Sequence, residues 1–439
     1  MSESHRSLIP DINGVIDPES HSAENYDVVV IGAGPSGSSC AYWLASSGYR
    51  VALVEKKVFP REKTCGDGLT PRAVYQLEKM GLTDELRQFH RYGGLRSIAF
   101  GRTLELPWPK HPILPNYGYV ARRSEIDQLV AHHAERQGVD IYMGYEAKEP
   151  EFSSETGAIS TVYIEDKKTR RFALNTRFVA ICEGSTPRFG RHVGLVRDKS
   201  YPMGMAIRGY YRSPMHDDPW IESHLDLVDK NGDFLPGYGW IFPVGDGTIN
   251  VGVGLLSTFK GYKDINTSRL METFCEIAPS YWGISPETSC GPPTGGKLPT
   301  GGSTGPKVGI NWVVAGDSAG LVNPFNGEGI AYGYETGAMA ADAIICAIKN
   351  DDPRELHTYT DALTNEFGQY YKVARLFVKY IGNPRVMREC VRVGMHSKPL
   401  MSWLLRIMAN LMRPDEKGIA ETAYKSLAAI VAREKTGIR

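Results

Sequence analysis

Short, uninterrupted apolar runs recur along the chain, and each is followed by a glycine-rich or charged turn. Runs of this kind are typical of strands that are buried on both faces of a parallel sheet. We expect them to share one sheet, although they lie far apart in the sequence. The runs are residues 28–31, 51–54, 178–181 and 312–315.

Segments with helical spacing of apolar residues lie between and after these runs. The spacing predicts helices over residues 38–47, 71–80, 123–136 and 330–348, and Thr70 precedes the second of these at a capping position. The pattern after residue 353 is helical as well.

The middle of the chain has a different pattern. Between residues 201 and 256, apolar and polar residues alternate between Gly and Pro turns, which predicts antiparallel strands. We expect these strands at residues 204–211, 224–228, 239–243 and 248–254. Residues 291–309 are rich in Gly, Pro and Thr without apolar periodicity, and we predict a loop there.

The first apolar run leads directly into Gly32-x-Gly34-x-x-Gly37. Gly32 permits a tight turn, Gly34 lets a pyrophosphate approach bare backbone, and Gly37 allows a helix to pack closely on the strand. The helix start offers unpaired N–H groups to an anion. The second run ends at Glu55, where a carboxylate would bind a ribose hydroxyl. This order predicts a dinucleotide site whose contact residues are Gly32, Ala33, Gly34, Pro35, Ser36, Gly37, Glu55 and Lys56.

We therefore predict an α/β protein with a Rossmann-like, split nucleotide-binding domain and an inserted antiparallel β-sheet domain that binds the substrate. A helical segment follows, and a polar tail precedes the first domain. The expected boundaries are 26–200 with 291–350 for the nucleotide-binding domain, 201–290 for the β-rich domain, 351–439 for the helical segment and 1–25 for a disordered tail.

Composition narrows the function further. The chain of 439 residues has 50 Lys and Arg against 50 Asp and Glu, so a nucleic-acid partner is not expected. Its seven cysteines are scattered without a C-x-x-C pair, which argues against a disulfide framework or a metal site and favours the cytoplasm. No apolar run reaches the length of a membrane-spanning helix.

A second glycine-rich segment follows the last apolar run. Gly316-Asp317 comes directly after that run and is followed by Asn-Pro-Phe-Asn-Gly-Glu-Gly-Ile at residues 323–330. Together with the first glycine motif, this segment resembles the flavoprotein superfamily of aromatic hydroxylases and geranylgeranyl reductases. The resemblance implies FAD, with Asp317 on the ribityl chain. It also implies that the helix start at Gly329 and Ile330 stabilises negative charge on the reduced isoalloxazine.

The same resemblance implies further FAD contacts. Arg123 corresponds to an arginine that opens a helix and contacts FAD, with Arg122 as the alternative, and the backbone of Ala147 would contact the adenine. Glu183-Gly184 stands where the hydroxylases have Asp-Gly, and no second G-x-G-x-x-G is present. Direct binding of NAD(P)H is therefore left open, and the external electron donor is NAD(P)H or a ferredoxin-like protein.

Cys65-Gly66-Asp67-Gly68 resembles the Cys-Gly segment that geranylgeranyl reductases carry beside the flavin ring. The resemblance assigns all four residues to the FAD site and makes Cys65 the candidate catalytic residue. Its thiol could donate a proton or shape the alkene pocket. The alternative is that small residues are needed here only to let the backbone approach the flavin.

Tyr238-x-Trp240-x-Phe242-Pro resembles a motif of prenyl reductases. Alternation along a strand puts Tyr238, Trp240 and Phe242 on one face, where they would form an aromatic wall for an isoprenoid. A plain aromatic core strand is the alternative.

The resemblance covers nearly the whole chain after Tyr26, and residues 65–73, 217–227 and 235–254 are most similar to actinobacterial menaquinone reductases. It implies an FAD-dependent oxidoreductase that saturates an isoprene double bond in the polyprenyl side chain of menaquinone. The alternatives are a monooxygenase (hydroxylase or epoxidase) of the same fold, a geranylgeranyl-lipid reductase, and a prenyl-binding protein without catalysis.

The C-terminal part contains two apolar segments, residues 377–381 and 401–412, among basic residues. A helix over the second segment would carry one apolar stripe of Trp403, Leu404, Ile407, Met408, Leu411 and Met412, with Arg385, Arg388, Arg392 and Arg406 nearby. Such a helix either lies in the headgroup region of a membrane or packs on the protein body. The first alternative predicts a peripheral protein on the inner face of the cell membrane.

Overall fold

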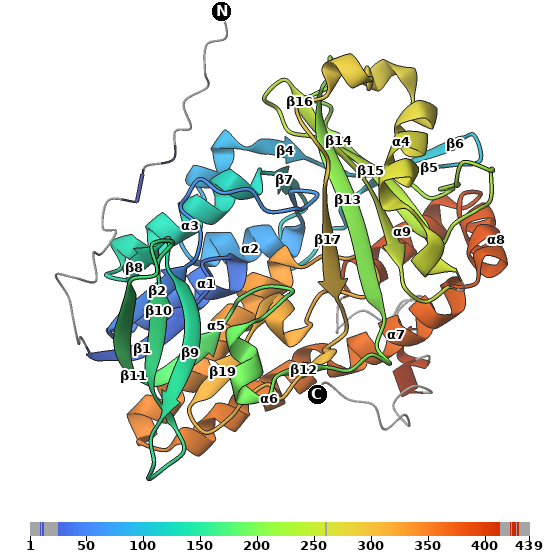
Figure 1. Cartoon of the computed structure of the whole chain (residues 1–439). Helices are drawn as coiled ribbons and strands as arrows, with labels where there is room; N and C mark the ends of the chain where they lie inside the picture. The colour runs from blue at the N-terminus through green and yellow to red at the C-terminus, as the bar shows by residue number, and fades with distance from the viewer. Residues whose placement is uncertain are drawn as a thin grey trace, which may run out of the picture.

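The computed structural model describes residues 25–259 and 261–412, together with residues 9, 11, 12, 422, 424–426, 428 and 429. Figure 1 shows the chain folded around two large sheets. Helices drawn in blue and orange lie beside the first sheet. Most of the predicted N-terminal tail and most of residues 413–439 lie outside the described residues. Within the tail, Ile9 and Ile12 are buried against the hydrophobic core.

The first sheet contains all four apolar runs that the sequence assigned to it. Its order is β8-β2-β1-β11-β10-β9, and β19 pairs with β11. The pairs β1–β2, β1–β11, β2–β8 and β11–β19 are parallel, whereas β9, β10 and β11 form an antiparallel edge. The strands are β1 (Asn25–Ile31), β2 (Val51–Glu55), β8 (Asp140–Met143), β9 (Glu146–Phe152), β10 (Ile159–Glu165), β11 (Arg171–Ile181) and β19 (Trp312–Val314).

The predicted helices of this domain are confirmed with small shifts in their ends. They are α1 (Pro35–Ser46), α2 (Pro71–Lys79), α3 (Arg123–Arg136) and α5 (Ile330–Asn350). α1 begins three residues earlier than predicted because Pro35 occupies its first turn. Thr70 is the residue before α2 but does not cap it, because its hydroxyl donates a hydrogen bond to Glu328 instead.

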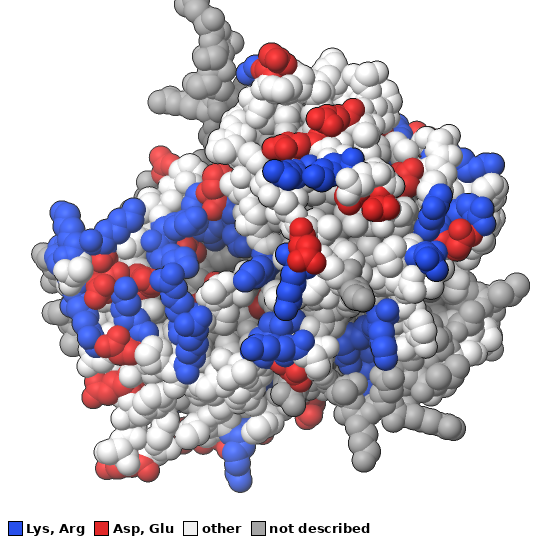
Figure 2. All heavy atoms as spheres, turned by 45° about the vertical axis from the view of Figure 1, so that its right-hand side comes forward, with Lys and Arg blue, Asp and Glu red and all other residues white. Residues whose placement is uncertain are grey.

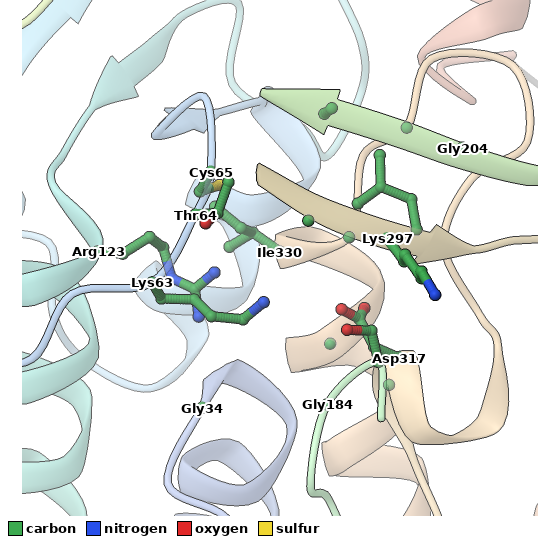
Figure 3. A pocket seen from close by; sticks show the side chains of 18 of the residues that line it. Gly34, Lys63, Thr64, Cys65, Arg123, Gly184, Gly204, Lys297, Asp317 and Ile330 are labelled. Carbon is green, nitrogen blue, oxygen red and sulfur yellow. The ribbon is translucent and has the colours of Figure 1, made fainter. Parts of the chain in front are cut away.

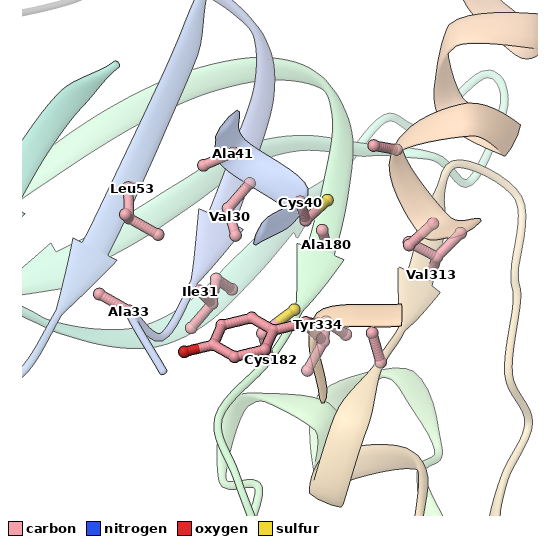
Figure 4. Close-up of a cluster of buried hydrophobic side chains, with 14 of the residues drawn as sticks. Val30, Ile31, Ala33, Cys40, Ala41, Leu53, Ala180, Cys182, Val313 and Tyr334 are labelled. Carbon is pink, nitrogen blue, oxygen red and sulfur yellow. The ribbon is translucent and has the colours of Figure 1, made fainter. Parts of the chain in front are cut away.

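Close packing of α1 requires two glycines. A Cβ at Gly37 would lie 1.7 Å from the carbonyl oxygen of Gly32, and one at Gly337 would lie 2.2 Å from that of Ser36. Glycine at these positions lets α1 touch both the turn after β1 and the long helix α5. Figure 4 shows the resulting core, where Val30 of β1 lies beside the small side chain of Ala41 from α1, and the ring of Tyr334 from α5 lies next to Cys182.

A second sheet stands beside the first in the order β17-β13-β16-β15-β14-β5-β6 (Figure 1). Its strands are β5 (Gly94–Ala99), β6 (Arg102–Pro107), β13 (Met203–Arg212), β14 (Trp220–His224), β15 (Gly237–Pro243), β16 (Thr248–Leu256) and β17 (Thr294–Pro299). The helix α4 (Thr267–Ile277) packs on one face through Leu270, Met271 and Phe274.

Two predictions for this region are wrong. The segment 291–309 is not a loop throughout, because β17 within it pairs along its whole length with β13. The strand expected at residues 224–228 ends at His224 and begins at Trp220. The sheet also extends beyond residues 201–290, since β5, β6 and β17 come from the flanking segments.

Smaller elements connect the two sheets. Short strands β3 (Gly68–Leu69), β4 (His90–Tyr92) and β7 (Gly118–Val120) form one small sheet, and β12 (Val196–Arg197) pairs with β18 (Thr304–Gly305). The 3-10 turns are Glu85–Gln88, Phe189–Val193, Tyr262–Asp264, Ser280–Trp282, Pro286–Thr288, Gly316–Ala319 and Pro353–Leu356, and a π-helical turn covers Thr364–Gly368.

The C-terminal helices are α6 (His357–Leu363), α7 (Gln369–Ile381), α8 (Pro384–Gly394) and α9 (Lys398–Met408). α9 packs on the body: Leu405 and Ile407 are buried, and Trp403, Leu404 and Met408 pack against the core clusters. The helix ends at Met408, so Leu411 and Met412 lie beyond it. The structure thus selects packing over a membrane-lying helix for this segment. In the described part of the chain, every helix is too short or too polar to span a bilayer.

Candidate functional site

A cavity of about 500 Å³ lies between the two sheets and is lined by residues of both. In Figure 3 the start of α1 at Gly34, the loop at Lys63–Cys65, Arg123, Lys297 and Asp317 surround it. Basic side chains border this hollowed part of the surface in Figure 2. The basic residues that line the cavity are Lys56, Lys57, Arg61, Lys63, Arg123, Arg208 and Lys297. They outnumber the acidic residues that line it, which are Glu55, Glu62, Glu146, Glu183 and Asp317, so the cavity suits an anionic ligand.

The turn from β1 into α1 forms the floor of this cavity. Gly32 has a φ of +100°, and a Cβ there would lie 2.4 Å from the carbonyl oxygen of Cys182, so only glycine fits the turn. A Cβ at Gly34 would approach only the guanidinium nitrogens of Arg61 and Arg123, at 3.9 and 4.0 Å. The space in front of Gly34 is thus open, and the free N–H groups of the helix start face it.

Glu55 ends β2 at the cavity wall, as the sequence predicted. Its carboxylate accepts hydrogen bonds from the backbone N–H of Ala33 and of Lys57, both at 3.0 Å. These bonds fix the side chain in a buried position beside the turn after β1. A fixed carboxylate with lone pairs to spare can accept a bond from a ribose hydroxyl.

A buried ion pair supports the opposite wall. Arg123, the first residue of α3, donates two hydrogen bonds to Asp127, both at 2.8 Å. Arg61 approaches the same carboxylate at 3.0 Å and also donates to the carbonyl oxygen of Ala33. Arg61 also lies 3.4 Å from the carboxylate of Glu55, so two carboxylates hold the two guanidinium groups in place at the cavity, where a pyrophosphate could accept hydrogen bonds from them.

Arg122 points elsewhere. It donates to Asp246 at 2.9 Å and to Thr248 at 2.6 Å, and its guanidinium lies over the ring of Tyr210. It is not among the residues that line the cavity, whereas Arg123 is. Of the two arginines that the sequence offered, the geometry favours Arg123.

The far side of the cavity is the start of α5. Asp317 stands in the turn after β19 and points into the cavity in Figure 3, and Ile330 opens the helix behind Gly329. A Cβ at Gly329 would lie 3.1 Å from the carboxylate of Asp317, so the backbone passes close to this acid. The positive ends of two helices, α1 and α5, consequently face one cavity.

Three aromatic residues of β15 form the wall beside this helix start. Tyr238, Trp240 and Phe242 all line the cavity, with ring centroids 5.9 Å and 6.3 Å apart. Between them, Gly239 and Ile241 face the other way, toward α4. The predicted alternation is therefore present. The hydroxyl of Tyr238 donates to the carbonyl oxygen of Asn326 at 2.7 Å, which ties the wall to the loop before α5.

The Cys65-Gly66 loop lies directly against the aromatic wall. A Cβ at Gly66 would lie 3.2 Å from the ring of Phe242 and 3.3 Å from the indole nitrogen of Trp240. Cys65 lines the cavity and is labelled with its sulfur in Figure 3. Burial raises the pKa of the Cys65 thiol, so this residue carries its proton at neutral pH.

Asn250 of β16 holds the loop and the wall together. It accepts a hydrogen bond from the indole nitrogen of Trp240 at 2.9 Å and donates to the carbonyl oxygen of Cys65 and to Asp67. Asp67 also accepts a hydrogen bond from the hydroxyl of Tyr210. Burial raises the pKa of Asp67 to about 6, against the effect of these two donors.

Not every predicted contact residue reaches the cavity. Ala33, Gly37, Asp67 and Gly68 are not among the lining residues. Gly37 and Asp67 instead serve packing and the hydrogen-bond network behind the cavity. The other predicted contact residues line it: Gly32, Gly34, Pro35, Ser36, Glu55, Lys56, Cys65, Gly66, Arg123, Ala147, Asp317, Gly329, Ile330, Tyr238, Trp240 and Phe242.

Comparison with known proteins connects this cavity to a family. Residues 25–207 match the family model described as "FAD binding domain". The menaquinone reductase of Mycobacterium tuberculosis is 36% identical over 395 residues, which cover 90% of this chain and 93% of the relative. The chain belongs to the menaquinone reductase family.

More distant relatives extend the match within the same fold. Digeranylgeranylglycerophospholipid reductase 2 of Methanosphaera stadtmanae is 28% identical over 79% of this chain and 85% of that protein. The crystal structure of a geranylgeranyl bacteriochlorophyll reductase-like protein from Thermoplasma acidophilum superimposes with a TM-score of 0.73. It is 20% identical and covers 92% of this chain and 99% of its own, so it supports the fold alone.

Membership of the menaquinone reductase family confirms the predicted cofactor, FAD. The residues present fit the group: an open backbone at Gly34, two helix starts, and buried guanidinium groups in one cavity. We propose that the start of α1, with Arg123 and Arg61, binds the pyrophosphate. Glu55 would bind the adenosine ribose, and Asp317 the ribityl chain.

Several residues of this menaquinone reductase-family site were missed by sequence reasoning. Arg61, Asn250 and Tyr210 belong to no motif, and their roles arise from contacts between segments far apart in the chain. The structure gives Glu183, which stands where the hydroxylases have Asp, a structural role. Its carboxylate accepts three backbone N–H bonds, each 3.0 Å long, from Arg188, Phe189 and Gly190. This side chain holds a local turn together.

Proposed function

We propose that the protein reduces an isoprene double bond in the polyprenyl side chain of menaquinone, with FAD as the cofactor. The observation that carries this proposal is the contact between Gly66 and the wall of Trp240 and Phe242 inside the FAD cavity. An aromatic wall at this place offers an apolar, flat surface to an isoprenoid. The names of the relatives in M. tuberculosis and M. stadtmanae agree with a polyprenyl substrate.

The chemistry requires a hydride at one alkene carbon and a proton at the other. FAD, when bound and reduced, supplies the hydride. The protein holds the alkene against Tyr238, Trp240 and Phe242 and keeps water away from it. An isolated alkene has no oxygen to polarise, so we assign no hydrogen-bond donor to that task.

Cys65 is the candidate source of the proton. Its thiol is half-buried at the cavity, and its raised pKa keeps it protonated. Once the proton has left, a proton from water restores the thiol. The two electrons come from an external donor, either NAD(P)H or a ferredoxin-like protein. The lipid-soluble quinone substrate lies in the membrane, and we propose that the protein works at the inner membrane surface.

Expression in a bacterium whose menaquinone has a fully unsaturated side chain tests the proposal. Mass spectrometry of the extracted quinones should reveal species 2 Da heavier for each saturated unit. Cells that express Trp240→Ala, or that carry the empty vector, should lack them. An unchanged quinone pool would count against menaquinone as the substrate, and a gain of one oxygen would support the monooxygenase alternative.

A further inference from the structure

The outer face of α8 carries apolar and basic side chains together. Val386 and Val393 are 39% and 60% exposed, and Tyr380, at the end of α7, is 62% exposed. Cys390 is exposed on the same helix. α8 lies at the edge of the molecule next to α9 in Figure 1. Within the described residues, no segment covers these apolar side chains of α8 and the end of α7.

The same helix is basic. Arg385, Arg388 and Arg392 are all exposed, and the only acid within α8 is Glu389, which pairs with Arg392. Figure 2, in which this side of the molecule comes forward, shows several Lys and Arg side chains at the right of the view with an acidic side chain among them. Helical geometry places the valines on a stripe beside the arginines. This arrangement is typical of a helix that lies in a membrane interface.

The inner face of α8 belongs to the cavity. Met387 is buried and lines the cavity together with Ile381 of α7 and Met408 of α9. One helix therefore separates the apolar end of the substrate cavity from the exposed apolar and basic surface. A polyprenyl tail that left a membrane at this surface would meet the apolar side chains of Ile381 and Met387 as it entered the cavity.

We propose that the outer face of α8, together with Tyr380, docks on an anionic lipid bilayer and admits the polyprenyl tail into the cavity. The arginines match acidic headgroups, and their long stems let the charges stay at the headgroup level while Val386 and Val393 enter the interface. A symmetric contact with a second copy is disfavoured, because it would place these arginines against each other. The inference rests on the proposed function for its substrate.

Flotation of the FAD-loaded, full-length protein with vesicles tests this surface directly. Binding to vesicles of phosphatidylglycerol should exceed binding to vesicles of phosphatidylcholine and should fall as salt rises. The triple variant Arg385→Gln, Arg388→Gln, Arg392→Gln should lose on the order of 100-fold in partitioning. The double variant Val386→Asp, Val393→Asp should lose at least as much on both lipids.

Matched controls lie on other exposed surfaces. The triple variant Arg87→Gln, Lys167→Gln, Lys168→Gln removes the same charge, and Val196→Asp alters a valine that is 69% exposed. Both should bind vesicles like the unaltered protein. Equal losses in the controls, or unchanged binding of the α8 variants, would overturn the proposal. A concentration-dependent dimer that the α8 variants abolish would assign the face to a second copy instead.

An activity measurement separates this inference from the proposed function. With a short-chain menaquinone dispersed in detergent, the α8 variants should retain full activity, because none of the altered residues lines the cavity. With long-chain menaquinone in anionic vesicles, they should lose it. If no form of the protein reduces either substrate, the proposed function fails, while the vesicle binding still decides the docking surface.

Discussion

The indole nitrogen of Trp240 donates a 2.9 Å hydrogen bond to the side-chain oxygen of Asn250. Through its amide nitrogen, Asn250 also donates to Asp67 and to the main-chain carbonyl of Cys65. One side chain thus fixes the proposed substrate wall relative to the loop that carries the candidate proton donor. Trp240 and Asp67 are buried. Replacing their hydrogen bonds to Asn250 by bonds to water would therefore cost free energy.

Asn250→Ala should therefore loosen the site and weaken the fold. It leaves Trp240 without an acceptor and Asp67 with one donor fewer, so we expect the free energy of unfolding to fall by about 2–3 kcal/mol. The KM for the quinone should rise several-fold, because the wall and the loop lose their fixed spacing. Chemical denaturation and steady-state kinetics measure the two effects. Asn231→Ala, in an exposed turn, is the control and should change neither.

Cys65→Ala tests the thiol separately from the loop. The bond to Asn250 uses the main-chain carbonyl of Cys65, so the variant should fold normally and bind FAD in full. Its kcat for alkene reduction should fall on the order of 100-fold if the thiol delivers the proton. Cys290→Ala, at an exposed cysteine, should keep full activity. Full activity of Cys65→Ala would show instead that the position requires only a small residue.

Arg123 and Arg122 should differ sharply in their effect on FAD. Arg123→Met breaks a buried pair with Asp127, although Arg61 remains beside that carboxylate. We expect a loss of stability on the order of 3 kcal/mol and at least a tenfold rise in the Kd for FAD. Arg122→Met lies outside the cavity and should leave the Kd nearly unchanged. The rise in flavin fluorescence on release gives the Kd for FAD of both variants. Equal changes in Kd would refute the assignment of Arg123, rather than Arg122, to the FAD site.

A buried glutamate should make stability depend on pH. Burial raises the pKa of Glu328 from 4.5 to about 7. The folded state thus holds this proton more tightly than the unfolded state. Glu328 contributes full stability below about pH 4.5 and loses that contribution as pH rises toward 7. Glu328→Gln should remove this slope and stabilise the apoprotein at pH 8 by about 1–3 kcal/mol.

The free energy of unfolding of Glu328→Gln, measured at pH 5 and at pH 8, is compared with that of the unaltered protein. The stabilisation should be near zero at the lower pH and largest at the higher one. Glu155→Gln, at an exposed position, should leave the pH dependence as it is. A glutamine that destabilises the protein equally at both values would mean that the carboxylate is ionised and bonded in the folded state.

Local periodicity carried most of the fold prediction. The apolar runs around Val30 and Leu53, the glycines before α1, and the alternation of Tyr238 with Trp240 are short-range patterns, and all are present in the structure. β17 could not be predicted in this way. Its residues Thr294–Pro299 are glycine-rich, and they form a strand only because β13 offers them a free edge.

The parts of the site that depend on tertiary contacts could not be predicted from local sequence patterns either. Asn250 is 183 residues from Asp67 in the chain, and Arg61 meets Asp127 only because the loop after β2 packs against α3 at the cavity. The apolar stripe of α9 illustrates an ambiguity that the sequence left open. Amphipathic spacing is the same for a helix that meets a membrane and for one that packs on a domain, and here Leu405 and Ile407 are buried.

A single-turnover reaction without oxygen tests the central claim most directly. The purified protein is reduced anaerobically so that one equivalent of reduced FAD is present, and menaquinone with an unsaturated side chain is added. After reoxidation of the quinone ring in air, mass spectrometry of the product reports on the side chain alone. The account predicts up to one equivalent of product that is 2 Da heavier in the tail, and much less with Trp240→Ala. An unaltered side chain, or a product formed only when oxygen is admitted, would contradict it.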